Sequence, residues 1–187
     1  MIQNSSEAEN AALLAIAQKM CIAARTAPKT KGDDYISACI VTGEEKENLA
    51  VEMERLSDEF NYGFFKRDAG NIRNSFAVVL IGVKNHYRAL NEGCGYCNFK
   101  NCADCAKHGG MCAYGPIDLG IAIGSAVSTA TDARVDNRVM FSAGRAALSL
   151  EILGKGIQDV IGIPISALGK SPYFDRSSGK PVKSEKK

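Results

Sequence analysis

Five of the seven cysteines in this chain fall within the twenty residues from Gly93 to Cys112, GCGYCNFKNCADCAKHGGMC. Their spacing is C-x2-C-x4-C-x2-C-x6-C. The two sulfurs of a C-x2-C unit can converge on one centre because the intervening turn is tight, and Gly95 favours such a turn. Thiols packed this densely among polar neighbours predict a metal centre. The other two, Cys21 and Cys39, fall in helix and strand patterns, where core packing is expected.

Two kinds of metal centre compete for this segment. A structural zinc site usually takes two C-x2-C units that stand well apart in the sequence, whereas here four residues separate Cys97 from Cys102. Closely spaced thiols on a single loop are more typical of an iron–sulfur cluster. The spacing therefore favours a 4Fe-4S cluster, with zinc as the alternative. The candidate ligands are Cys94, Cys97, Cys102, Cys112 and Cys105.

Composition and charge exclude several other functions. The net charge is +2, and the basic residues after position 175 leave the rest of the chain close to neutral, so no basic face for nucleic acid is expected. No apolar run is long enough to cross a membrane, and the N-terminus does not read as a signal peptide. An odd number of crowded cysteines fits the reducing cytoplasm. No nucleophile motif or phosphate-binding Walker loop appears, which leaves no basis for a hydrolase.

Periodicity predicts helices that alternate with a few apolar strands. Helices are expected from Ser5 or Ser6 as the cap to about residue 26, over 44–60 and 117–133, and over 139–154 with Gly154 or Gly156 ending the last one. Strands are expected at 35–43, 76–83 and 159–168, and 61–75 reads as turn-rich. These elements predict one α+β (or α/β) domain over 1–175. The cysteine-rich loop 93–112 is inserted between a strand and a helix, and 176–187 is a disordered basic tail.

The segment CGYCNFKNC resembles the 4Fe-4S domain in the B subunit of bacterial electron-transport complexes. In that domain a similar loop is completed by a more distant fourth cysteine. The resemblance implies that Cys94, Cys97 and Cys102 are the first three ligands and that Cys112 is the fourth. Cys105, one helical turn after Cys102, is the alternative fourth ligand.

Nearly the whole chain resembles the bacterial ferredoxin domain-containing proteins of unknown function. The stretches that carry this resemblance are CGYCNFKNCADC, IDLGIAIGSAVSTATDARVDNRVMFSAGRAA and AARTAPKTKGDDYI. The resemblance implies a bound cluster and names no reaction, so no catalytic residue is predicted.

A second likeness bears on mechanism. AARTAPKTKGDDYISACIVTGEEKENLA is similar to the opening of nitroreductase-like flavoproteins, and IDLGIAIGSA and VIGIPISALG resemble their second half. This implies a nitroreductase-like sheet packed with helices, a homodimer with FMN at the subunit interface, and hydride or electron transfer at the flavin.

Several cations are candidates for binding such a cofactor. Arg25, Lys29 and Lys31 could meet the FMN phosphate, or they could be solvated charges at a helix C-terminus. Arg134 or Arg138 could contact an anionic cofactor or the other subunit, or belong to an ion-pair corner together with nearby aspartates. Gly120 and Gly124 leave a flat helix face that suits close packing or a dimer interface.

Overall fold

The fold is built around a central strand, β2 (Ala77–Lys84), in which every residue but the last is buried. It pairs on one side with β1 (Ile36–Val41) and on the other with β4 (Ile157–Ser166), which also pairs with the two-residue β3 (Asp136–Asn137). All three pairings are antiparallel, in the order β1-β2-β4-β3. The three long strands confirm the expectation from the sequence, whereas β3 is too short to leave a pattern.

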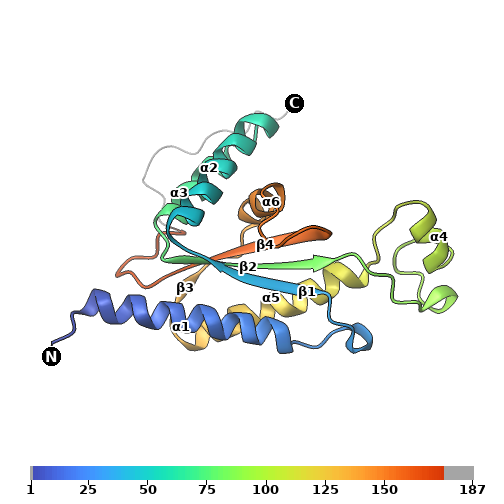
Figure 1. Cartoon of the computed structure of the whole chain (residues 1–187), viewed down its shortest axis with the longest axis horizontal. Coiled ribbons are helices and arrows are strands. Elements are labelled where there is room, and N and C mark those ends of the chain that lie inside the picture. Colours follow the sequence, from blue (N-terminus) through green and yellow to red (C-terminus); the bar gives the residue numbers. More distant parts are fainter. Residues whose placement is uncertain (1, 175–187) are drawn as a thin grey trace.

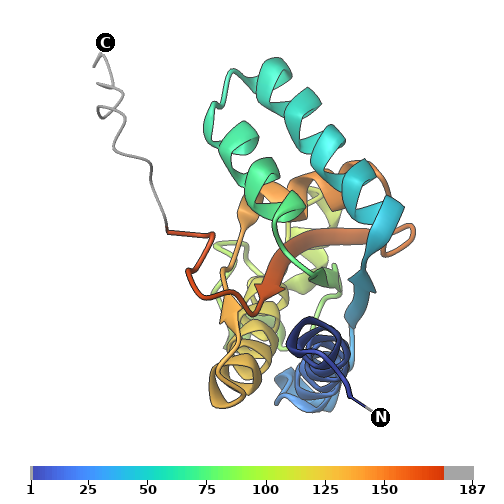
Figure 2. The same cartoon turned by 90° about the vertical axis from the view of Figure 1, so that its left-hand side faces the viewer.

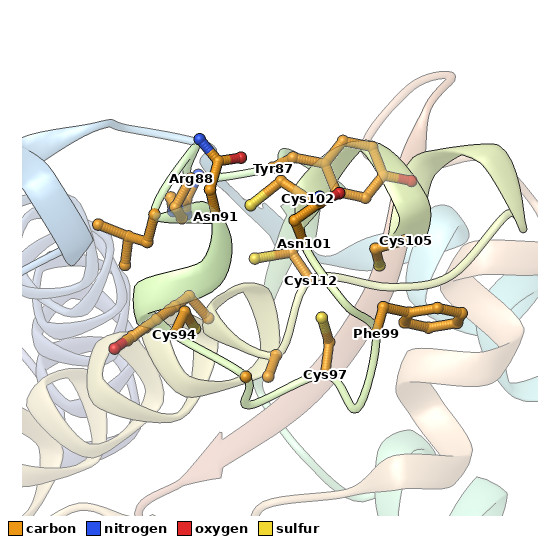
Figure 3. A pocket seen from close by; sticks show the side chains of 14 residues that line it. Tyr87, Arg88, Asn91, Cys94, Cys97, Phe99, Asn101, Cys102, Cys105 and Cys112 are labelled. Carbon is orange, nitrogen blue, oxygen red and sulfur yellow. The ribbon is translucent and has the colours of Figure 1, made fainter.

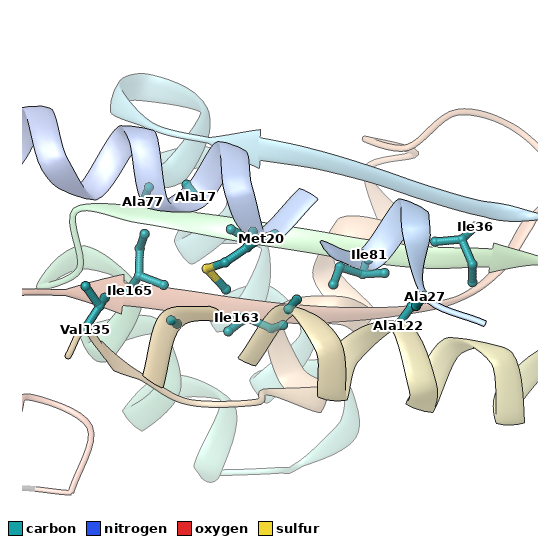
Figure 4. Packing of buried hydrophobic residues seen from close by; sticks show 14 of the residues in the cluster. Ala17, Met20, Ala27, Ile36, Ala77, Ile81, Ala122, Val135, Ile163 and Ile165 are labelled. Carbon is teal, nitrogen blue, oxygen red and sulfur yellow. The ribbon is translucent and has the colours of Figure 1, made fainter. Parts of the chain in front are cut away.

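Two helices cover one face of the sheet. They are α1 (Ser5–Thr26) and α5 (Tyr114–Asp132), which lie side by side beneath it in Figure 1. The small residues Ala17 and Ala122 are completely buried among Met20, Ile81 and Ile163, and they let the helices approach the strands closely (Figure 4). The helix cap differs from the expected serines, because Asn4 precedes α1 and its side chain accepts a hydrogen bond from the Glu7 amide at 2.9 Å.

Three helices cover the opposite face, namely α2 (Gly43–Phe60), α3 (Phe64–Arg73) and α6 (Phe141–Ser149). Figure 2 shows α2 and α3 above the sheet and the α1–α5 pair below it. The sheet therefore lies between two helical layers, an α+β arrangement.

Two expectations for this face were wrong. The segment 61–75 contains α3, because Phe65, Ala69 and Ile72 recur at helical spacing and are completely buried, which outweighs the turn-forming Gly70 and Asn71. Helix α6 ends at Ser149, before either expected glycine. There Glu151 takes a left-handed φ of 50°, and the Ile152 amide donates to the Ala147 carbonyl at 3.1 Å, as at a Schellman-type helix end.

The remaining elements lie in connections. A 3-10 turn, η1 (Thr30–Gly32), joins α1 to β1. Between β2 and α5 the chain forms the expected cysteine-rich excursion, which includes η2 (Asn91–Gly93) and α4 (Cys102–Lys107) and extends beyond the end of the sheet as a separate lobe (Figure 1). The computed structural model describes residues 2–174, so the tail expected at 176–187 lies outside the described residues. Among the described helices none is long and apolar enough to cross a membrane.

Gly144 in α6 provides a test of this packing. A methyl group on Gly144 would lie 1.8 Å from the Val160 carbonyl oxygen of β4, whereas a methyl group on Gly70 in α3 meets nothing within 4 Å. We expect Gly144→Ala to force α6 away from the sheet and to lower the free energy of unfolding by several kcal/mol, as overpacking a core does (~1–3 kcal/mol or more).

Gly70→Ala is the matched control. It should raise the free energy of unfolding by up to about 1 kcal/mol because alanine is the better helix former. Urea denaturation followed by circular dichroism measures both changes, and equal stability of the two variants would contradict the packing described.

Candidate metal centre

All five loop cysteines line one pocket in the lobe between β2 and α5. Figure 3 shows their side chains projecting from different turns of the loop toward the same space. Cys105 and Cys112 are buried, whereas Cys94, Cys97 and Cys102 are partly exposed. The structure therefore brings together the complete set of ligands predicted from the sequence. His108, which lies within the same segment, is not among the residues that line the pocket.

Local backbone geometry explains how one short loop presents so many thiols. Gly95 and Asn98 both take left-handed conformations, with φ of 69° and 61°, and the Asn98 amide donates to the Gly95 carbonyl at 3.1 Å. This is the tight turn that the C-x2-C spacing predicted at Gly95. Next, Asn101 caps α4 by accepting from the Asp104 amide at 2.9 Å, which fixes Cys102 and Cys105 one turn apart on a helix.

Residues directly after β2 close the loop on itself. The Asn85 side chain accepts a hydrogen bond from the Cys112 amide at 3.2 Å, and the Tyr87 hydroxyl donates to the Gly110 carbonyl at 2.9 Å. Sequence analysis missed Asn85 and Tyr87, as well as Arg88 on the pocket wall. Their partners lie more than twenty residues further along the chain, so no local pattern could have revealed them.

The thiols interact with one another electrostatically. Burial raises the pKa of the Cys105 thiol to about 11, and a hydrogen bond with Cys97 and the negative charges of Cys97, Cys112 and Cys102 add to this effect. The Cys105 thiol also donates to the Met111 carbonyl at 3.7 Å. Thiolates gathered in one pocket repel each other, and a cationic centre among them would relieve the repulsion.

The pocket has a volume of about 360 Å³, part of which is open to solvent. Among the described residues, no three His, Cys, Asp or Glu side chains converge closely enough to coordinate a single ion. The thiols thus surround a space without meeting at a point. The donor set suits an iron–sulfur cluster, since four thiolates are what such clusters require and five are present.

The other two cysteines lie outside the pocket. Cys21 packs against the α1–α5 side of the sheet and Cys39 against the opposite side. Burial raises the pKa of the Cys39 thiol to about 11, with a smaller contribution from Cys21. Both are therefore packing residues, as expected from the sequence.

The first three candidate cations for FMN lie together at the end of α1, near the lobe. Arg25 pairs with Asp34, and the Lys29 ammonium donates to the carbonyls of Arg25 and Ala27. The Lys31 ammonium donates to the Arg88 carbonyl at 3.2 Å. The Lys29 ammonium is thus directed to carbonyl groups at the end of α1, whereas Arg25 and Lys31 are both exposed.

The other two candidate cations lie elsewhere. Arg134 and Arg138 follow the C-terminus of α5, a 19-residue helix about 28 Å long that begins beside the cysteine pocket. Arg138 donates to the Tyr173 carbonyl at 3.1 Å and lies 3.8 Å from Asp68. Arg138 was expected to pair with aspartates close to it in the sequence, and it lies instead near Asp68 of α3. One chain does not bring these two arginines together with Lys31.

Comparison with solved structures identifies the fold. A nitroreductase with bound FMN from Desulfitobacterium hafniense DCB-2 has a TM-score of 0.57 at 13% sequence identity, over 100% of this chain and 88% of that one. A nitroreductase family protein from Clostridium novyi NT has a TM-score of 0.56 at 16% identity, over 86% of this chain and 76% of that one. At these identities the likeness establishes a nitroreductase-like fold.

Sequence comparison identifies the family. A protein of Archaeoglobus fulgidus described as uncharacterized is 40% identical over 188 residues, which cover 96% of this chain and 100% of that protein. Residues 108–176 match the family described as uncharacterized proteins containing a ferredoxin domain, and the matched part includes Cys112. The chain belongs to this family of ferredoxin domain-containing proteins.

Proposed function

We propose that this protein is a redox protein that binds a 4Fe-4S cluster through Cys94, Cys97, Cys102 and Cys112. The observation that carries the proposal is the gathering of five thiols from one loop around one pocket. The ferredoxin domain in the family description supports it. When bound, the cluster supplies one-electron transfer.

Cys112 is the better fourth ligand for two reasons. Its amide is fixed by Asn85, and α5 begins two residues later, so its position is tied to the body of the protein. The Cys105 thiol instead donates to the Met111 carbonyl, within its own loop. Cys105 then lies behind the four ligands and helps to exclude water from them.

Zinc is disfavoured by the spacing of the thiols along the chain. A structural zinc ion needs four ligands that meet about 2.0–2.3 Å from one point. Its two C-x2-C units usually stand well apart in the sequence, whereas here only four residues separate Cys97 from Cys102, a spacing more typical of a cluster bound by one loop. The alternative, a zinc-stabilised structural or interaction protein without catalysis, would be supported if the metal analysis described below finds zinc.

The proposal extends to a flavin. The nitroreductase-like fold supports FMN as a second cofactor, since one solved structure of that fold is described with bound FMN. A flavin converts between one- and two-electron steps, which would link the cluster to a hydride donor or acceptor. Lys31 is the cation that we assign to the FMN phosphate, because it is exposed and, among the residues that the structure describes, it donates to a carbonyl group and not to a carboxylate.

The proposal also includes a homodimer formed through α5. Ile117 and Ile121 are each 42% exposed on this helix, and methyl groups added to Gly120 and Gly124 would meet nothing within 4 Å. These four residues recur at helical spacing and form one open apolar face. A second copy could approach it closely, since the glycines present only backbone.

The cluster assignment predicts the metal content of cysteine variants. Protein purified without oxygen should contain about four irons and four sulfides per chain and absorb broadly near 400 nm. Cys94→Ser and Cys97→Ser should lose most of the iron and the absorption because each removes a ligand. Metal analysis and the visible spectrum measure both. Stoichiometric zinc in a colourless protein would contradict the proposal.

Three further cysteine variants refine the assignment. Cys21→Ser is the matched control, since Cys21 packs against the sheet, and it should retain full iron. Cys112→Ser should lose more iron than Cys105→Ser. The reverse order would make Cys105 the fourth ligand and leave the cluster assignment intact.

The flavin assignment predicts the effect of removing one charge. Lys31→Gln should weaken FMN binding about ten- to a hundredfold, the usual effect of losing a charge-assisted hydrogen bond (~1.5–3 kcal/mol). Lys19→Gln, on the exposed side of α1, is the control and should bind normally. Equilibrium dialysis with free FMN measures the affinity. Equal FMN affinity of the unsubstituted protein and both variants would contradict the assignment of Lys31 to the FMN phosphate.

The dimer predicts a change in molar mass. Gly124→Arg should convert a dimer to a monomer, because a charged side chain would occupy the open α5 face. Gly70→Arg places the same residue at another open helix position and should leave the mass unchanged. Light scattering after gel filtration measures the mass, and a monomeric unsubstituted protein would refute the dimer.

A further inference from the structure

Arg88 is a buried cation on the wall of the cysteine pocket. Its side chain is 1% exposed, and its Nη2 donates to Asp118 Oδ2 at 2.6 Å, where Asp118 is equally buried in the first turns of α5. Figure 3 labels Arg88 at the edge of the space that the cysteines surround. A charge with so little contact with water is screened weakly, so it acts strongly on neighbouring groups.

The ion pair uses only part of the guanidinium group. Arg88 Nε and Nη1 are both buried, and neither has a hydrogen-bond partner among the described residues. Unpaired buried donors are uncommon in proteins because removing them from water costs free energy that nothing repays. Two such donors on a residue that lines a pocket of thiols indicate a missing acceptor in that pocket.

Several contacts fix the orientation of this group. Asp118 Oδ1 accepts from the Thr30 amide at 3.0 Å and from the Thr30 hydroxyl at 2.9 Å, which positions the carboxylate. The guanidinium lies 5.0 Å from the centre of the Tyr35 ring, and the Arg88 carbonyl accepts from Lys31. Arg88 is therefore fixed by Lys31 of η1, by Tyr35 after that turn and by Asp118 of α5.

We propose that Arg88 is a positioning residue that raises the reduction potential of the cluster, by donating from Nε and Nη1 toward its sulfur atoms, and that Asp118 moderates this effect. The inference rests on the proposed function. Cysteine ligands bind as thiolates, and one-electron reduction adds a further negative charge. A nearby cation and N–H donors to sulfur favour the reduced form, whereas a carboxylate disfavours it.

Two substitutions should therefore shift the potential in opposite directions. Arg88→Met removes the cation and should lower the potential by at least a tenfold change in the ratio of reduced to oxidised cluster, which is 59 mV for one electron. Asp118→Asn removes the opposing charge and should raise it. A potentiometric titration followed by visible and electron paramagnetic resonance spectra measures both. Loosening of the loop alone would move both variants in the same direction.

Controls separate this inference from the cluster assignment. Iron and sulfide are measured in every protein, and Arg138→Met, beyond the far end of α5, should leave the potential unchanged. If the unsubstituted protein contains no cluster, the proposed function and this inference both fail. If all proteins contain a cluster but Arg88→Met has an unchanged potential, only the inference about Arg88 fails.

A milder variant covers the case in which Arg88→Met does not retain the cluster. Arg88→Lys keeps a cation for Asp118 but lacks the two additional donors of the guanidinium, so its potential should lie below that of the unsubstituted protein. A potential equal to that of the unsubstituted protein would overturn the role of Nε and Nη1.

Discussion

The burial of β2 on both faces is the constraint on which the rest of the structure depends. Its apolar side chains alternate between two cores, with Val79 and Ile81 facing the α1–α5 layer and Val78 and Leu80 facing the α2–α3–α6 layer. Neither helical layer could bury its apolar surface without this strand. Since β2 ends beside the lobe and α5 begins there, both ends of the cysteine loop are attached to elements of the buried core.

The lobe itself has much weaker support. Its helix α4 has six residues, too few to be stable alone in water, and Cys105 and Cys112 are the main apolar groups that it buries. The hydrogen bonds that Asn85 accepts from the Cys112 amide and that Tyr87 donates to the Gly110 carbonyl close the loop, but they supply little net stability in partly exposed positions. A bound metal centre would add the missing free energy, because ligand binding that requires the folded loop stabilises that fold.

The sequence predicted those parts of the structure that depend on local pattern. The long strands, helices α1, α2 and α5, and the inserted cysteine loop followed from periodicity and spacing. Helix α3 was missed because Gly70 and Asn71 favour turns, and the helix is stabilised by burial of its apolar face against α2. The early end of α6 depends on one left-handed residue, Glu151, which carries no sequence signal for that conformation.

The sequence likewise predicted only part of the candidate site. The five cysteines could be assigned because the chemistry of a thiol cluster is visible in the residue types themselves. Asn85, Tyr87 and Arg88 could not, because they act through contacts with residues such as Gly110, Cys112 and Asp118, and these partners become neighbours only when β2 and α5 are in place.

Helix α5 connects the proposed cluster site and the proposed dimer interface. Asp118 points inward to Arg88 and Thr30, while Ile117 and Ile121, within one turn of it, face outward on the open side of the same helix. A second subunit seated on that side would exclude water from the segment that carries Asp118. Lower local polarity strengthens the electrostatic interactions of Arg88 and Asp118 with groups in the cysteine pocket. In the proposed dimer, therefore, assembly and the potential of the cluster are coupled through one turn of α5, although the two sites share no residue.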